Sequence, residues 1–125
     1  MTKILYVEDN EDNVYMLSRR LKRKGFDIVI AVDGVQGVEM ASSEKPDLIL
    51  MDLSLPKMDG WTATKHIKSN AELKSIPIIA LSAHAMEEHK QRAIDSGCDD
   101  YDTKPVDINR LLSKISEQLG IKNDQ

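Results

Sequence analysis

Five residues of this sequence could together hold and transfer a phosphoryl group, and each follows a short apolar run. The set consists of three acids, one hydroxyl and one lysine: Glu8, Asp9, Asp52, Ser82 and Lys104. Three carboxylates held close together repel one another, so near neutral pH they raise a pKa or recruit a cation. Hard oxygen ligands with room for water favour Mg²⁺. A carboxylate can form an acyl phosphate, and ammonium and hydroxyl groups can bind phosphate oxygens. The set therefore predicts phosphoryl transfer to Asp52 if the fold brings the five together.

Short apolar runs alternate with segments of helical periodicity along the chain. The runs indicate buried parallel strands, and they lie at Ile4–Val7, Ile28–Ala31, Leu48–Met51, Ile78–Leu81 and, more weakly, Tyr101–Thr103. The helical segments are Val14–Leu21, Val35–Ala41, Trp61–Ile67, Met86–Ser96 and Ile108–Leu119. Five such units predict an α/β, flavodoxin-like fold, a doubly wound five-stranded parallel sheet in the order 2-1-3-4-5. Ligands of such sheets bind at the carboxyl ends of the strands, where the five residues would meet.

The composition is that of one globular domain, with 41% hydrophobic and 30% charged residues in 125. We predict a domain over residues 2–120 and a polar tail at 121–125, with no output domain. A net charge of -4 argues against direct nucleic-acid binding. The sequence contains neither a run long enough to cross a membrane nor a signal-peptide core, so we expect a cytoplasmic protein without a membrane partner. The single Cys98 can form no internal disulfide.

Five short motifs together resemble the receiver domain of two-component response regulators, particularly single-domain chemotaxis and cell-cycle regulators. The motifs are Val7–Asn10, Asp47–Asp52, Leu55–Gly60, Leu81–Ala83 and Lys104–Pro105. The resemblance extends over about residues 2–120 and implies a role for each matching position.

The resemblance implies that Asp52 is the phosphoacceptor. The expected cofactor is Mg²⁺, with Mn²⁺ as a possible substitute. Its ligands would be Glu8, Asp9, Asp52 and the backbone carbonyl of Ser54. The acidic pair is Glu-Asp where Asp-Asp is more usual, so Glu8 can reach the metal through water.

The resemblance also assigns residues around the phosphoryl group. Ser82, Ala83 and Lys104 would bind it or respond to it, and Tyr101 would be the aromatic rotamer switch. Tyr101 could instead be a simple aromatic residue of an edge strand. The Lys104–Pro105 peptide is expected to be cis. Val106 replaces a frequent aromatic residue after Lys-Pro.

Three further residues carry finer expectations. Gly60 is expected to permit a tight turn before the third helix. Ser54 and His84 lie two residues after Asp52 and Ser82 and are hypothesised to tune dephosphorylation. The alternative for His84 is an exposed loop histidine without a role.

The implied function is a phosphorelay step rather than turnover of an external substrate. A histidine kinase or histidine phosphotransfer protein would donate the phosphoryl group, docking near the first helix. Phosphorylation would shift the fourth helix, fifth strand and fifth helix to an active conformation that binds an unnamed downstream protein. The fourth helix is very polar and is either such a partner surface or merely solvated. The protein is expected to be a monomer or a phosphorylation-dependent dimer.

Three other functions remain open on the sequence. A haloacid-dehalogenase-like enzyme would need a second acid two residues after Asp52, where Ser54 stands. A flavodoxin-like cofactor binder would need a phosphate loop after the first strand, where Glu8–Asp12 is acidic. A receiver-like module that is never phosphorylated is the third. Taken singly, Asp9 or Ser82 is more simply a turn or capping residue.

Overall fold

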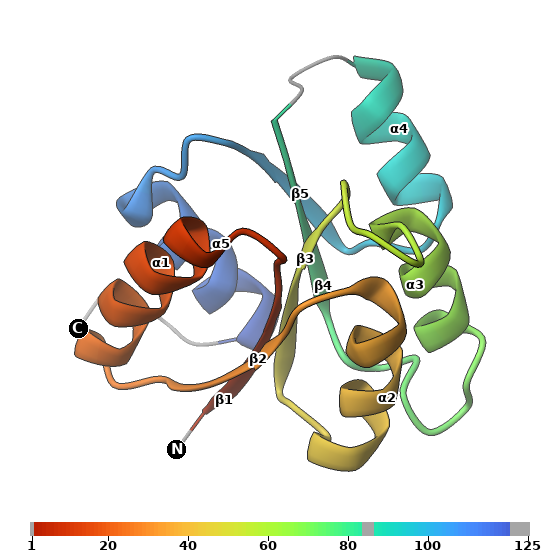
Figure 1. The fold of residues 1–125 in the computed structure, drawn as a ribbon, viewed down its shortest axis with the longest axis horizontal. Coiled ribbons are helices and arrows are strands. Elements are labelled where there is room, and N and C mark those ends of the chain that lie inside the picture. Colours follow the sequence, from red (N-terminus) through yellow and green to blue (C-terminus); the bar gives the residue numbers. More distant parts are fainter. Residues whose placement is uncertain (1, 84–86, 121–125) are drawn as a thin grey trace.

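A five-stranded parallel sheet forms the centre of the protein in a computed structural model, which describes residues 2–83 and 87–120 (Figure 1). Over these ranges the order of elements is β1 (Lys3–Val7), α1 (Glu11–Arg23), β2 (Asp27–Ala31), α2 (Gly34–Glu44), β3 (Leu48–Asp52), α3 (Gly60–Lys68), β4 (Ile78–Ser82), α4 (Glu87–Asp95), β5 (Asp100–Thr103) and α5 (Ile108–Leu119). The strands are arranged β2-β1-β3-β4-β5 and all pairs are parallel. The predicted fold is therefore confirmed. His84, Met86 and the predicted tail at 121–125 lie outside the described residues.

The helices cover both faces of the sheet (Figure 1). On one face, strand residues such as Ile4 and Leu50 pack with Leu17 of α1 and Leu111 of α5. On the other face, the alternate strand residues pack against α2, α3 and α4. Every residue of β3 is buried, so the strand that ends in Asp52 is held from both sides. Within the described ranges, no helix combines the length and apolar character needed to cross a membrane.

Asparagine and aspartate side chains begin four of the described helices close to the carboxyl ends of the strands. Each accepts a hydrogen bond from the backbone N–H three residues later: Asn10 from Asn13, Asp33 from Gln36, Asp59 from Thr62 and Asp107 from Arg110. These bonds satisfy amide groups that have no partner inside the helix. The helices therefore start at defined residues and fix the loops that carry the candidate site.

Gly60 is needed for a different reason from the one expected. It is the first residue of α3, and its φ is not in the left-handed region. A Cβ atom there would lie 2.3 Å from the backbone oxygen of Asp52 and 2.8 Å from Cα of Leu53. Close packing of α3 against the end of β3, rather than a tight turn, therefore requires a glycine at this position.

Candidate functional site

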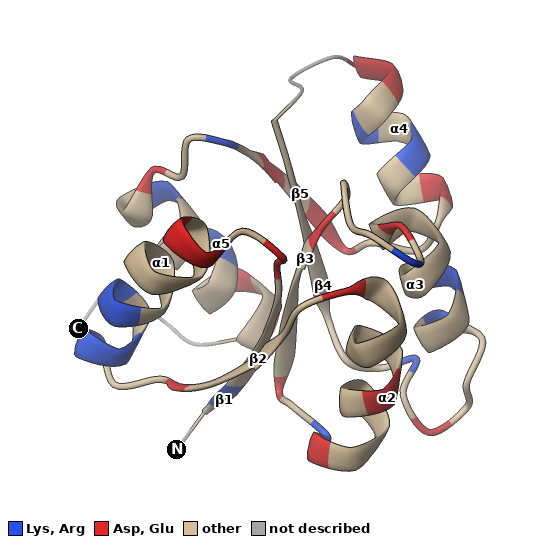
Figure 2. Cartoon of the chain, viewed as in Figure 1, with Lys and Arg blue, Asp and Glu red and all other residues tan. Residues whose placement is uncertain are grey.

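The five residues singled out in the sequence lie at one edge of the sheet. Glu8 and Asp9 follow β1, Asp52 and Ser82 are the last residues of β3 and β4, and Lys104 follows β5. Among the described residues, carboxylate oxygens of Glu8, Asp9 and Asp52 lie within 4.8 Å of one another. Figure 2 shows acidic segments at the ends of β1 and β3 and in the first turn of α1. The fold thus assembles the predicted acidic cluster.

Lys104 lies between two of these carboxylates. Its Nζ is 2.7 Å from Oε1 of Glu8 and 3.0 Å from Oδ1 of Asp52. The Glu8 and Asp52 side chains are 1% and 5% exposed, and that of Lys104 is 20% exposed. Two carboxylates are thus held in a nearly dry environment with one ammonium group, where charges interact strongly.

Burial and neighbouring charges change the pKa values of this group. Burial, followed by the charge of Glu8, raises the pKa of Asp52 from 3.8 to about 6, although Lys104 partly offsets the increase. Burial lowers the pKa of Lys104, but its hydrogen bonds with Glu8 and Asp52 outweigh this and leave the pKa raised. Asp52 is therefore mainly ionised at neutral pH and holds a proton in mildly acidic solution.

Two residues near Glu8 were not recognised in the sequence. The hydroxyl of Tyr6 donates to Oε1 of Glu8 over 3.3 Å, and the side-chain amide of Asn13 donates to the same oxygen over 3.5 Å. Burial, followed by the charge of Glu8, raises the pKa of Tyr6, so its hydroxyl remains protonated. Tyr6 resembles any other core residue of a strand, and Asn13 any polar helix residue. Only the i, i+2 spacing of Tyr6 and Glu8 signals that they share a face of the sheet.

Ser82 and Tyr101 lie on the neighbouring strands β4 and β5. Ser82 is 4% exposed and pairs in register with Thr103 of β5. Its backbone oxygen accepts a hydrogen bond of 2.8 Å from the backbone N–H of Lys104. Tyr101 is 7% exposed and packs in the core on the α3 and α4 side of the sheet. Its ring therefore points inward in this structure.

The remaining predicted residues lie in the loops at this edge. Ser54 is exposed in the loop after β3, and Ala83 is exposed directly after β4. The Lys104–Pro105 peptide bond is cis, as expected from the sequence.

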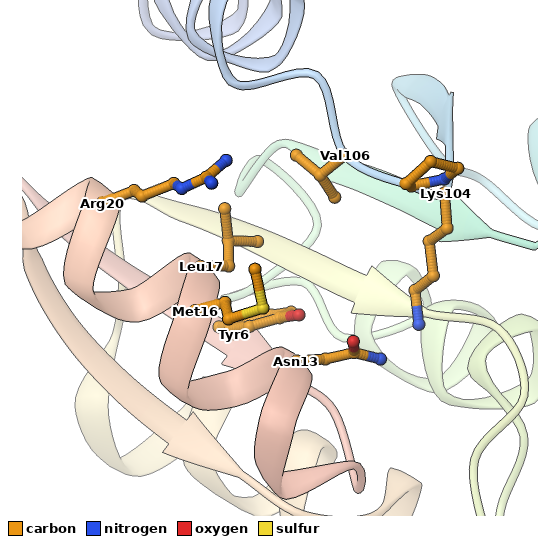
Figure 3. Close-up of a pocket in the computed structure, with 8 residues that line it drawn as sticks. Tyr6, Asn13, Met16, Leu17, Arg20, Lys104 and Val106 are labelled. Atoms are coloured by element: carbon orange, nitrogen blue, oxygen red, sulfur yellow. The ribbon is translucent and has the colours of Figure 1, made fainter.

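A pocket of about 340 Å³ adjoins the acidic cluster between α1 and the segment after β5 (Figure 3). Its lining residues are Tyr6, Asn13, Met16, Leu17, Arg20, Lys104, Pro105 and Val106. Met16 and the neighbouring Tyr15 are 55% and 61% exposed. Because Lys104 both lines the pocket and contacts Asp52, a group bound in the pocket would lie next to the candidate site.

Comparison with known proteins agrees with this arrangement. The model of the response regulator receiver domain family matches residues 4–116. The polar-differentiation response regulator DivK of Brucella ovis is 36% identical over 121 residues, which cover 96% of this chain and 98% of that protein.

Two solved structures have the same fold. The receiver domain of sensor histidine kinase PA1611 from Pseudomonas aeruginosa PAO1, with a magnesium ion coordinated in its active site cleft, is 34% identical. It has a TM-score of 0.89 and covers 95% of this chain and 98% of its own. The receiver domain of Saccharomyces cerevisiae Ssk1, solved with the histidine phosphotransfer protein Ypd1, is 31% identical. It has a TM-score of 0.89 and covers 98% of this chain and 93% of its own. The chain therefore belongs to the response regulator receiver domain family of two-component signalling proteins.

Proposed function

We propose that this receiver domain accepts a phosphoryl group on Asp52 from a phosphohistidine of a kinase or a histidine phosphotransfer protein. The observation that carries the proposal is the placement of Asp52, a buried carboxylate on a rigid strand, 3.0 Å from Nζ of Lys104. In the transfer, a carboxylate oxygen of Asp52 forms a bond to phosphorus. The phosphorus–nitrogen bond breaks and its electron pair returns to the imidazole. The product is an acyl phosphate on Asp52, which the protein itself later hydrolyses. The protein is thus a phosphoryl acceptor and does not turn over an external substrate.

The donor set fits a small divalent cation. Three carboxylates lie within 4.8 Å of one another, and the exposed Asp9 leaves room for water. Glu8, Asp9, Asp52 and the backbone carbonyl of Ser54 would hold Mg²⁺, with Mn²⁺ as a substitute. Bound there, Mg²⁺ would neutralise charge on the phosphoryl oxygens during in-line displacement. The magnesium ion in the similar receiver domain of PA1611 supports this choice.

The neighbouring side chains have distinct roles in the proposal. Lys104 would move part of its ammonium contact from Asp52 to one phosphoryl oxygen. The hydroxyl of Ser82 would donate to a second phosphoryl oxygen, with Ala83 next to it. Ser54 and His84 would set how easily water reaches the acyl phosphate.

The output is proposed to be a shift in population on the α4, β5 and α5 side. Ser82 moves toward the phosphoryl group, and the inward position of Tyr101 belongs to the active arrangement. The exposed Ile94 of α4 would contribute to the docking surface for a downstream protein. Arg92 is also exposed on α4, and its guanidinium lies 3.8 Å from the ring of Trp61 in α3.

Phosphorylation by a small-molecule donor tests the central claim. Incubation with acetyl phosphate and Mg²⁺ is expected to add one phosphoryl group to the wild-type chain by intact mass, and none to Asp52→Asn. Peptide mapping after borohydride reduction should place the modification at residue 52. A modified Asp52→Asn variant, or a wild-type chain that remains unmodified, would contradict the proposal.

The donor protein is proposed to dock on the pocket between α1 and the segment after β5. The exposed Met16 at this pocket suits an apolar side chain of the partner. Arg20, Lys22 and Arg23 in the last turn of α1 would favour acidic groups around it (Figure 2). The complex of Ypd1 with the Ssk1 receiver domain supports a histidine phosphotransfer protein as one such partner.

A charge placed in this contact is expected to block the partner but leave the chemistry unchanged. Met16→Glu should slow phosphotransfer from a histidine phosphotransfer protein by about tenfold or more, because it puts a carboxylate against an apolar contact. Its rate with acetyl phosphate should stay within about twofold of wild type. Ile94→Glu, an exposed apolar residue of α4, is the matched control and should leave both rates unchanged. Equal slowing in the two variants would contradict docking at α1.

A further inference from the structure

The carboxylate of Glu8 is the most heavily hydrogen-bonded group of the acidic cluster. Among the described side chains, three donors converge on its Oε1 atom: Nζ of Lys104 at 2.7 Å, the hydroxyl of Tyr6 at 3.3 Å and the amide of Asn13 at 3.5 Å. Its other oxygen accepts from the backbone N–H of Asn10 at 3.3 Å. Figure 3 shows the Tyr6 hydroxyl, the Asn13 amide and the Lys104 amine directed toward the same region. Glu8 is therefore held at both of its oxygens.

The donors differ in how firmly they are fixed. Lys104 is a flexible side chain that also contacts Asp52, and Asn13 is only half-buried on α1. Tyr6 is 1% exposed, and its ring is packed in the core between the sheet and the α1 and α5 helices. Its hydroxyl position is thus determined by the core. Of these three side-chain donors, Tyr6 is the least mobile.

A glutamate at this position needs such support. Its side chain is one methylene longer than aspartate and has an additional rotatable bond, so an unsupported carboxylate would sample several positions. A cation site formed with Asp9 and Asp52 needs the Glu8 oxygens in one place. The Tyr6 hydroxyl, which is bonded to Glu8, therefore acts on the site without contacting the cation or the phosphoryl group.

We propose that Tyr6 is a positioning residue, whose hydroxyl fixes the Glu8 carboxylate and thereby preorganises the cation site formed by Glu8, Asp9 and Asp52. The inference rests on the metal site of the proposed function and adds to it a hydroxyl from the core of β1. Tyr6 also lines the pocket proposed for the donor protein, so one residue contacts both sites.

The test compares two substitutions that each remove one tyrosine hydroxyl. Tyr6→Phe keeps the buried ring, and Tyr15→Phe removes an exposed hydroxyl that accepts a hydrogen bond from Arg19. Mg²⁺ alone is titrated into each protein by isothermal calorimetry. We expect the dissociation constant of Tyr6→Phe to rise about tenfold, the size seen when a residue supporting a metal ligand is removed. Tyr15→Phe should match wild type within about twofold.

A second measurement separates positioning from a general loss of stability. The rate of phosphorylation by acetyl phosphate is followed against Mg²⁺ concentration for Tyr6→Phe. The half-saturating concentration should shift by about the same tenfold factor, with the rate at saturating Mg²⁺ within about twofold of wild type. A Tyr6→Phe variant with a lower melting temperature but the Mg²⁺ affinity of wild type would overturn the inference on Tyr6 and leave the proposed function intact. A wild-type protein without Mg²⁺ affinity would overturn the proposed function as well as the inference.

Discussion

Lys104→Met is expected to lower the free energy of unfolding of the metal-free protein by about 2–4 kcal/mol near neutral pH. The methionine retains most of the side-chain volume but leaves Glu8 and Asp52, 1% and 5% exposed, without their shared cation. Breaking a fully buried ion pair by removing one partner costs somewhat more, and the 20% exposure of Lys104 reduces the expected loss. Lys104 is thus expected to stabilise the fold before any phosphoryl group arrives.

Urea unfolding in the presence of a chelator measures this loss. Lys114→Met is the matched control, because it removes a 3.3 Å ion pair with Asp100, whose two side chains are about one-quarter exposed, and a 2.8 Å hydrogen bond to the backbone oxygen of Tyr101. That variant should lose about 1 kcal/mol, less than Lys104→Met. The double variant Lys104→Met/Asp52→Asn should recover part of the loss, since one uncompensated carboxylate has been removed. Equal losses in Lys104→Met and Lys114→Met would contradict this prediction. They would show that water screens Glu8 and Asp52 more than their low exposed fractions indicate.

The fold was predictable because four of the five strands are apolar runs that can be recognised from the local sequence, whereas the fifth is only a weak run. Runs such as Leu48–Met51 are apolar throughout, as strands buried on both faces must be. Right-handed crossovers and the 2-1-3-4-5 order then place Asp52 beside Glu8 without any knowledge of side-chain positions. The main differences were at the ends of elements: β3 includes Asp52 and β4 includes Ser82, because their backbones still pair with the neighbouring strands.

The details of the site depend on side-chain torsions, which a linear pattern does not encode. Tyr6 and Asn13 look like core and surface residues, and only their rotamers direct both to one oxygen of Glu8. The requirement at Gly60 was likewise visible only in three dimensions, since it arises from the backbone oxygen of Asp52 rather than from its own dihedral angles. Residue type and spacing therefore identified the carboxylates and the lysine that the fold brings together, but missed Tyr6 and Asn13, which hold Glu8.

Asp52→Asn is expected to stabilise the metal-free protein while it abolishes phosphorylation. The pKa of Asp52 is raised from 3.8 to about 6, chiefly by burial and then by Glu8. Between these two values the folded state binds a proton that the unfolded state does not. The contribution of Asp52 to stability is thus present below about pH 4 and is lost as the pH rises through about 6. Asparagine has no ionised form and avoids this loss.

The difference in free energy of unfolding between Asp52→Asn and wild type should therefore depend on pH. It is expected to be near zero at about pH 4 and to reach about 1–3 kcal/mol in favour of the variant at about pH 8. The pKa of about 6 already includes the stabilising contact of Asp52 with Lys104, and Lys104 retains its 2.7 Å contact with Glu8 in the variant. Urea midpoints measured across this range in chelator, for both proteins, provide the comparison. A variant less stable than wild type at pH 8, or a difference that does not change with pH, would contradict the raised pKa. A positive result would mean that the residue proposed to accept the phosphoryl group is kept ionised at a cost to the fold, as expected where reactivity rather than stability determines the residue.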